Sequence, residues 1–317
     1  MQNKFGIGYN GPPRKISMDE FVFREKAFNE EIQEYKDAYF ADDLEGQFDA
    51  LIDLIVFAVG AGLQHGFDME EGVKRVMKAN NFKDIVKTAD DSKRGYKHDL
   101  VKPEGWREPY LQDLIKPSKY KGLIILDGPD ACGKTTLAEH LRDNYGAVVF
   151  HSTWSPELEN RMEKYMLQTM EMAISISQNQ LVVLDRLWLS EMVYSHVFRP
   201  PSTRVALHTS LSALAFSSGA RVIVCLPYDI QTTLNGFESM QKTRGEMYST
   251  MLEVYRVYEG LYNGTFSTGG SNVYIEEIMP IGGLKEASNV VRYDYSSDGQ
   301  DMEHFIKANN LVKTNDK

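Results

Sequence analysis

The sequence is poor in cysteine, in positive charge and in long apolar runs. Its 317 residues contain only two cysteines, Cys132 and Cys225, which are too few for a disulfide framework and favour a reducing cytoplasm. Lys and Arg number 35 against 45 acidic residues, and the net charge of -10 argues against a protein that coats nucleic acid or anionic lipid. The longest apolar run, Leu51 to Leu63, carries Asp53 and is shorter than the roughly 20 residues that a membrane span needs. We therefore expect a cytoplasmic protein without a membrane segment.

The composition is otherwise that of a globular protein, and the spacing of apolar residues differs between the two halves of the chain. From about residue 18 to residue 89 the apolar residues recur at helical spacing. From residue 120 short aliphatic runs, expected to be strands, alternate with amphipathic segments, and this order implies a parallel sheet covered on both faces. The expected strands are 122–127, 147–150, 181–185, 220–226 and 289–295, and the expected helices include 135–145, 156–178 and 245–262. We predict an all-α domain over residues 1–117 and a three-layer α/β domain over residues 118–317.

A phosphate-binding motif lies between the first strand and the first helix of the second domain. Residues 128–135, GPDACGKT, fit the P-loop pattern G-x-x-x-x-G-K-[ST] in the strand-to-helix context that the motif requires. Lys134 is expected to bridge the β- and γ-phosphates of ATP, and Thr135 to hold Mg²⁺. The alternative is a chance glycine turn before a helix, which the register of strand, loop, lysine and helix disfavours. The expected ATP-binding residues are Gly128, Asp130, Gly133, Lys134, Thr135 and Thr136.

Two further groups of charged residues narrow the chemistry. The strand 181–185 ends in Asp185-Arg186, where the carboxylate can orient the Mg²⁺ shell or accept a proton and the guanidinium can clamp a second phosphate. Lys242 and Arg244 precede an aromatic helix, as in a basic loop that closes over a transferred phosphate. The alternatives are a strand-capping Asp–Arg pair and an ordinary solvated charge pair.

These motifs together resemble a known kinase family. GPDACGKTT, DRLWLSEMVY and RGEMY are similar to the thymidylate kinase-like deoxynucleoside monophosphate kinases, especially phage-type members, over roughly residues 120–311. The resemblance implies transfer of the ATP γ-phosphoryl group to a dNMP, with Lys134, Asp185, Arg186 and Arg244 as the catalytic residues. A cysteine in the P-loop, Cys132, is unusual and predicts sensitivity to thiol modification. The residues expected to bind the acceptor nucleotide are His151, Trp154, Ser190, Tyr194 and Lys242, although an aromatic residue after a strand more often belongs to the core.

The first domain concentrates acidic residues on two helices. Glu31 and Glu34 are spaced i,i+3, and Asp49 and Asp53 are spaced i,i+4, so each pair lies on one helix face. Like charges repel, and a divalent cation such as Mg²⁺ or Mn²⁺ is a natural reason to gather carboxylates. The alternative is a solvated acidic face, but Asp53 lies within ALIDLIVFAVGAG, where an unpaired charge is costly. We therefore predict a metal site formed by these four residues.

The acidic pattern resembles the MazG-like all-α nucleoside triphosphate pyrophosphohydrolases, over about residues 18–114. Their signature is EExxE followed by ExxD on neighbouring helices, and here Ala50 replaces the first acidic residue of the second motif. By this resemblance Asp49 substitutes for it, while Asn80 and Lys83 contact the substrate phosphates or complete the metal site. The implied reaction is Mg²⁺-dependent cleavage of a dNTP to dNMP and pyrophosphate. Small helical units of this kind usually pair, so a homodimer or homotetramer is expected.

The fusion predicts a bifunctional nucleotide-pool enzyme of viral or mobile-element origin, acting in the host cytoplasm if viral. Hydrolysis to a dNMP and phosphorylation of the same dNMP would be futile, so the two domains are expected to differ in base preference. One alternative is an idle helical domain that serves only oligomerisation, given Ala50. Another is a kinase that phosphorylates a modified base within DNA, which the acidic balance and the lack of a basic stripe disfavour.

Overall fold

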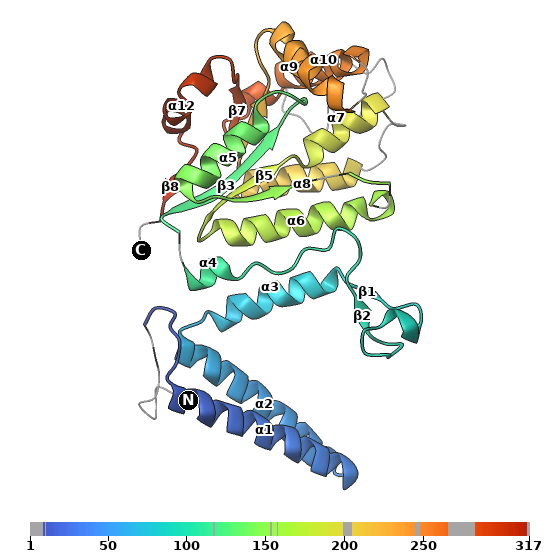
Figure 1. The fold of residues 1–317 in the computed structure, drawn as a ribbon, viewed down its shortest axis with the longest axis vertical. Helices are drawn as coiled ribbons and strands as arrows, with labels where there is room; N and C mark the ends of the chain where they lie inside the picture. The colour runs from blue at the N-terminus through green and yellow to red at the C-terminus, as the bar shows by residue number, and fades with distance from the viewer. Residues whose placement is uncertain are drawn as a thin grey trace. The chain divides into compact units, whose positions relative to one another are not determined.

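The structure is a computed structural model that describes residues 9, 11–116, 118–152, 154–156, 158–198, 205–244, 248–265 and 283–315. The chain forms two compact units (Figure 1). The helical unit comprises Met1–Lys78 and Pro109–Pro117, and the α/β unit comprises Ala79–Glu108 and Ser118–Lys317. Residues 79–108, which the sequence analysis assigned to the first domain, are therefore compact with the second. The chain passes between the units three times, after residues 78, 108 and 117.

The helical unit is built on an antiparallel pair of long helices. Its elements are α1 (Met18–Phe40), α2 (Leu44–His65), α3 (Met69–Asn81, which crosses into the α/β unit at its end) and α4 (Gln112–Ile115). Ser17 and Glu20 form a capping box that satisfies the free N–H groups at the start of α1. Gly66 ends α2 at φ 74°, a left-handed conformation that glycine adopts without strain. The all-α prediction for this part of the chain is confirmed.

A buried ion pair fixes α4 against α3. Arg75 Nη1 donates to Asp113 Oδ1 at 2.5 Å, and Arg75 Nη2 donates to Asp113 Oδ2 at 2.9 Å. The two side chains are 4% and 0% exposed. Arg75 also donates to the Tyr110 carbonyl at 2.8 Å and pairs with Glu71 at 2.9 Å, so its guanidinium is held on three sides. Such a bidentate pair gives α4 a defined position although the helix is only one turn long.

Helix α2 leaves an unusual amount of apolar surface exposed. Its only buried residues are Ala50, Gly60, Gly62 and Gln64. Among the described helices it is also the one that is long and apolar enough to cross a membrane by length and composition. Two ionised carboxylates one turn apart in mid-helix, Asp49 and Asp53, would be costly in a bilayer, which argues against a membrane span. The exposed residues of α2 at helical spacing are Phe48, Leu51, Ile52, Ile55, Val56, Val59 and Leu63.

The α/β unit contains the predicted parallel sheet. Its strand order is β4-β5-β3-β6-β7, with all four pairings parallel, and β8 adds an antiparallel pairing to the start of β3. The strands are β3 (Tyr120–Asp127), β4 (Val148–His151), β5 (Leu181–Asp185), β6 (Arg221–Cys225), β7 (Val290–Tyr293) and β8 (Lys313–Thr314). Each predicted strand is present within one or two residues of its expected bounds at most ends, because continuous apolar runs identify doubly covered strands well.

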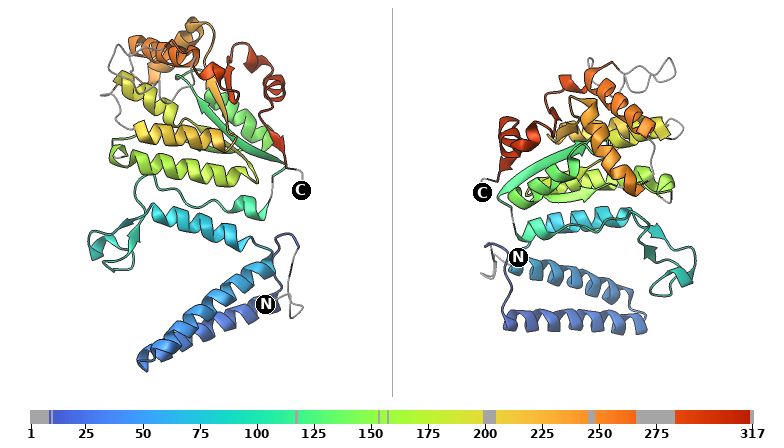
Figure 2. Two further views of the ribbon diagram at one scale, coloured as in Figure 1. Left: turned by 180° about the vertical axis from the view of Figure 1, so that it is seen from behind. Right: turned by 45° about the horizontal axis from the view of Figure 1, so that its top comes forward.

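Helices cover both faces of this sheet (Figure 2). Side chains of β3, β5 and β6 that alternate along each strand pack with α5 (Lys134–Tyr145) and α12 (Met302–Ala308) in one apolar core. The opposite face packs against α6 (Met162–Ser177), which lies beside α8 (Val205–Ser217). The remaining helices are α7 (Trp188–Phe198), α9 (Ile230–Arg244) and α10 (Tyr248–Asn263). The prediction of a three-layer α/β fold is confirmed.

The chain between α3 and α4 contains a small ribbon. β1 (Asp84–Ile85) pairs antiparallel with β2 (Leu100–Val101), and a 3-10 turn at Ala89–Asp91 lies between them. Two-residue strands have no readable period, so the sequence could not reveal this pairing. Trp106 donates from Nε1 to the Ala79 carbonyl at 2.7 Å and packs the far end of the segment against the end of α3.

The buried pair between α3 and α4 predicts a large and local loss of stability. In Asp113→Ala the guanidinium of Arg75 stays buried without its bidentate partner, and we expect the free energy of unfolding to fall by about 3–5 kcal/mol. Urea unfolding followed by circular dichroism measures this change. Lys74→Ala is the matched control, because Lys74 pairs with Glu70 on the exposed face of α3 and such a pair contributes only about 0.3–0.5 kcal/mol. Equal losses in the two variants would contradict the assignment.

Candidate functional sites

The helical unit brings its acidic residues together around one buried carboxylate. Glu31 is 7% exposed, and its Oε2 atom is buried without a hydrogen-bond partner among the described residues. Burial raises the pKa of Glu31, and the negative charges of its neighbours raise it further. The contributing neighbours are Glu34, Asp53, Glu30 and Asp49. α1 and α2 therefore place all four predicted ligands within electrostatic reach of one another.

These carboxylates fit a divalent cation in chemistry, although they do not converge as a closed ligand set. Among the described residues no three His, Cys, Asp or Glu side chains lie close enough together to hold a metal ion. An unpartnered buried oxygen on Glu31 is the kind of atom that a cation would satisfy. Ala50 is buried whereas Asp49 is exposed, so the two positions point to different sides of α2. Among the predicted ligands, Glu34 and Asp53 are the two whose charges raise the pKa of Glu31 most.

Asn80 and Lys83 belong to the other unit. Both lie in Ala79–Glu108, which is compact with the α/β sheet, whereas the acidic helices lie in the helical unit. Lys83 Nζ lies 5.5 Å from the centroid of the Trp106 ring, a cation–π contact within the segment. The structure thus gives Lys83 an aromatic partner within its own segment.

The P-loop of the α/β unit joins β3 to α5 with a geometry that only glycine permits at two positions. Gly128 has φ 140°, and a Cβ there would lie 2.2 Å from the carbonyl oxygen of Cys225. Gly133 has φ 77°, and a Cβ there would lie 2.6 Å from Cβ of Tyr295. Thr135 and Thr136 stand exposed in the first turn of α5, where the helix N-terminus favours anionic ligands. These positions agree with the predicted phosphate cradle.

The P-loop lysine lies folded into its own loop. Lys134 is 6% exposed, and its Nζ donates to the Gly128 carbonyl at 3.0 Å and to the Pro129 carbonyl. Burial lowers the pKa of Lys134, and the nearby guanidinium of Arg186 lowers it further. A bound phosphate would provide the counter-charge that this buried ammonium lacks. The arrangement therefore favours an anionic ligand at this loop.

Asp185, at the carboxyl end of β5, faces His151 at the end of β4. The distance from His151 Nδ1 to Asp185 Oδ2 is 2.8 Å. The Ser152 N–H also donates to the Asp185 carbonyl at 3.0 Å, which ties the β4 exit to β5. Asp185 Oδ1 is buried without a hydrogen-bond partner among the described residues, as is Ser152 Oγ. Two unsatisfied polar atoms at the end of adjacent parallel strands indicate a place where a ligand or cation completes the bonding.

Arg186 is held in a strained backbone conformation next to the P-loop. Its φ is 69°, which is unusual for a residue with a side chain. Its guanidinium pairs with Asp130 of the P-loop and donates to the Gly128 carbonyl at 3.1 Å. Tyr194 also donates to Asp130, at 3.1 Å, and its ring centroid lies 5.1 Å from Arg186 Cζ. The structure thus brings three predicted residues, Asp130, Arg186 and Tyr194, into one network.

A buried carboxylate that the sequence analysis did not single out lies at the centre of this region. Asp127, the last residue of β3, is 0% exposed and accepts from Ser190 Oγ at 2.7 Å and from the Tyr258 hydroxyl at 2.5 Å. Burial and the Asp127 charge raise the pKa of Tyr258, so its hydroxyl stays a proton donor. Ser190, predicted to bind the acceptor, is buried and engaged with Asp127. An Asp directly before the P-loop glycine was the available signal.

The remaining predicted residues divide between exposed and undescribed positions. Trp154 is 48% exposed, and its Nε1 donates to Glu159 at 2.7 Å, so its ring lies at the surface of the β4 exit. Lys242 and Arg244 lie at the end of α9, and their side chains are outside the described residues. Cys132 is 1% exposed, and burial raises the pKa of its thiol, which argues against the expected sensitivity to modification.

Comparison with known proteins finds a family match for the N-terminal part of the chain. Residues 4–80 match the family model of phosphoribosyl-ATP pyrophosphohydrolase. This match confirms the predicted pyrophosphohydrolase-type domain at the N-terminal end of the chain. No curated protein matches the chain.

Several solved structures are similar to this chain at low sequence identity. The YorR protein of Bacillus subtilis, solved with phosphorylated GDP, is 17% identical, with a TM-score of 0.38, covering 59% of this chain and 97% of that chain. Thymidylate kinase of Candida albicans is 13% identical, with a TM-score of 0.37, covering 62% and 96%. Deoxyadenosine kinase of M. mycoides, solved with bound dATP, is 13% identical, with a TM-score of 0.34, covering 59% and 99%.

The family match and the P-loop describe different parts of the chain. The P-loop, the parallel sheet and the charged residues at the carboxyl edge of the sheet all lie in the α/β unit. Residues 4–80 match the family model of phosphoribosyl-ATP pyrophosphohydrolase, and the chain joins this helical domain to a P-loop α/β unit in one multidomain protein.

Proposed function

We propose that the protein is a bifunctional nucleotide-pool enzyme. The helical unit hydrolyses a dNTP to dNMP and pyrophosphate with Mg²⁺, and the α/β unit phosphorylates a dNMP to the dNDP with ATP. The observation that carries the kinase activity is that Lys134 and Arg186 both donate to the Gly128 carbonyl of the P-loop, while Arg186 also pairs with Asp130. The hydrolase activity rests on the acidic cluster around Glu31 together with the family match over residues 4–80.

The kinase reaction follows from these residues. An oxygen of the acceptor monophosphate attacks the γ-phosphorus of ATP, and the bond to the β–γ bridging oxygen breaks, so that ADP leaves and a dNDP forms. Mg²⁺ held by Thr135 would neutralise charge on the β- and γ-phosphates. Lys134 leaves the P-loop carbonyls for the phosphates, and Arg186 leaves Asp130 to hold the acceptor phosphate. Asp185 and His151 lie where the acceptor enters, at the ends of β5 and β4.

The hydrolase reaction requires the acidic cluster to bind a cation. Bound Mg²⁺ would lower the pKa of a coordinated water and bring it to the substrate phosphates. Glu31, Glu34 and Asp53 would hold the cation, and Asp49 would approach from the exposed side of α2. The raised pKa of Glu31 means that cation binding competes with a proton at this carboxylate, so metal affinity falls as the pH is lowered.

The combined activities suggest remodelling of a nucleotide pool. If both units accepted the same base, the product of the first would be the substrate of the second and the reactions would waste ATP. We infer that one dNTP is removed while another monophosphate is raised to the diphosphate. This division of labour suits the synthesis of DNA precursors by a phage.

The first of three predictions from this proposal concerns the helical unit. Glu34→Gln should abolish Mg²⁺-dependent pyrophosphate release from dNTPs, with a loss on the order of 100-fold, because it removes a ligand charge. Release of pyrophosphate is measured across a panel of four dNTPs. Glu25→Gln, on the same helix and outside the cluster, should retain activity. Wild-type protein that releases no pyrophosphate from any dNTP would favour an idle oligomerisation domain.

The second prediction concerns the P-loop. Lys134→Met should lower phosphoryl transfer on the order of 100-fold or more, because it removes the charge that bridges the ATP phosphates. Transfer from labelled ATP is measured with the four dNMPs and with oligonucleotides as acceptors. Lys307→Met changes an exposed lysine of α12 and should leave transfer unchanged. Retained hydrolase activity in Lys134→Met, and retained kinase activity in Glu34→Gln, would show that the two sites are separate, and transfer to oligonucleotides alone would contradict the proposed acceptor.

The third prediction concerns self-association. We infer that the exposed apolar stripe of α2 packs against a second copy of this chain, because a continuous stripe at helical spacing is the pattern of a symmetric helix–helix interface. Ile55, 59% exposed, lies within the stripe, and Ile55→Lys should shift the protein toward monomer in size-exclusion chromatography with light scattering. Ile85, 68% exposed in β1, is a matched isoleucine outside the stripe, and Ile85→Lys should not change the mass. A wild-type monomer would contradict the inference.

A further inference from the structure

The segment Ala79–Glu108 contacts α6 and the turn before it near both of its ends. At one end, Asp84 pairs with Arg161 and lies 3.9 Å from Lys164, just before and within α6. At the other end, Gly105 approaches α6 so closely that a Cβ would lie 2.9 Å from the ring of Tyr165. The segment therefore covers α6 and the loop that leads from β4 to it.

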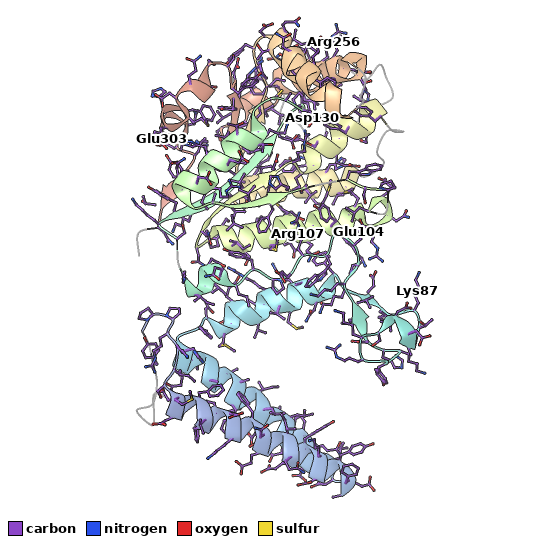
Figure 3. All side chains as sticks on the ribbon, viewed as in Figure 1. Lys87, Glu104, Arg107, Asp130, Arg256 and Glu303 are labelled. Carbon is purple, nitrogen blue, oxygen red and sulfur yellow. The ribbon has the colours of Figure 1, made fainter. Side chains whose placement is uncertain are left out.

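Arg107, near the end of this segment, contacts both α6 and β4. Its Nε donates to Thr169 Oγ1 at 3.1 Å, and its Nη2 donates to the Tyr165 hydroxyl at 2.8 Å, both in α6. The guanidinium lies 5.3 Å from the Tyr165 ring centroid and 5.5 Å from that of Phe150 in β4. Gln168 donates in turn to the Arg107 carbonyl at 2.8 Å. Figure 3 shows Arg107 and Glu104 beside α6.

The same guanidinium holds the residue that contacts Asp185. Arg107 Nη2 donates to the His151 carbonyl at 2.8 Å, and the ring of His151 lies 2.8 Å from the Asp185 carboxylate. A second bond, donated by Ser155 Oγ to Glu104 of the segment at 3.3 Å, holds the β4 exit four residues further on. The backbone of the β4 exit is therefore fixed from the connecting segment, outside the P-loop fold proper.

We propose that Arg107 is a positioning residue of the kinase site, so that the connecting segment is a working part of the acceptor subsite. It fixes the His151 backbone, which sets the ring against Asp185 and the surface on which the acceptor dNMP rests. This inference rests on the proposed kinase function. It predicts an effect on the acceptor nucleotide and none on ATP, because Arg107 contacts α6 and the end of β4 and, among the described residues, not the P-loop at residues 128–135.

The test compares Arg107→Met and Arg107→Lys in the full-length protein. Arg107→Met keeps a long apolar side chain but loses every donor, and we expect kcat/KM for the dNMP to fall roughly 10- to 100-fold, with KM for ATP changed less than about twofold. Arg107→Lys keeps one charged donor and should recover part of the loss. Steady-state kinetics with each substrate varied separately give this split, and thermal unfolding checks that both variants are folded.

Arg94→Met is the matched control. Arg94 lies in the same segment, its side chain is 78% exposed, and its guanidinium pairs with Asp99. Its kinetics should equal those of the wild type. Arg107→Met kinetics equal to those of Arg94→Met, or an equal rise in KM for ATP and for dNMP, would overturn the proposal.

A binding measurement separates this proposal from the proposed function. Calorimetry gives the Kd of wild type and variants for the dNMP without any turnover. If the wild type transfers no phosphate but Arg107→Met still weakens dNMP binding, the kinase reaction is wrong and the positioning role stands. If the wild type is an active kinase and Arg107→Met binds and phosphorylates dNMP as the wild type does, the kinase function stands and the positioning role is wrong.

Discussion

The carboxylate of Asp127 organises the α/β unit at the point where its sheet meets its phosphate loop. Buried charges are tolerated when hydrogen bonds satisfy them, and Asp127 accepts from the Gly128 N–H, from the N–H and hydroxyl of Ser190, and from the Tyr258 hydroxyl. These donors come from the P-loop, from α7 and from α10. One carboxylate thus fixes the entry of the P-loop relative to two helices that are distant in sequence. The positions of Arg186 and Tyr194, which flank Asp130, depend on the same part of α7.

The helical unit is under a different constraint, because apolar surface and negative charge compete for the same two helices. α1 and α2 pack on each other through small residues such as Ala50 and Ala27, while larger side chains such as Phe48 and Ile55 stay exposed. Between the helices, Glu31 is buried near other carboxylates, whose negative charges raise its pKa. Both features are unfavourable for an isolated hairpin, and each would be relieved by binding, the first by a protein surface and the second by a cation.

Sequence patterns predicted the elements of the fold better than the partners of the site residues. Continuous aliphatic runs revealed β3, β5 and β6, and the P-loop motif identified Gly128, Gly133 and Lys134, because these signals are local. The sequence could not show that Ser190 is buried on Asp127, since the pairing joins residues 63 positions apart. The sequence did not show that Asn80 and Lys83 belong to the compact α/β unit, because helical spacing in α3 continues past residue 78, where the chain leaves the helical unit. Arg107 carried no signal, because its role depends on three separate segments meeting.

The threefold passage of the chain between the units has a consequence for how such a fusion can evolve. A fusion joined by one linker can be separated or recombined at a single point in the gene, and each part keeps its structure. Here a break after residue 117 would leave residues 79–108 on the fragment that carries the acidic helices, and the α/β fragment would lack the chain that covers α6. The two halves therefore cannot be exchanged as independent modules. Recombination that keeps both units intact must keep residues 79–108 with the α/β unit, so the two units are inherited together.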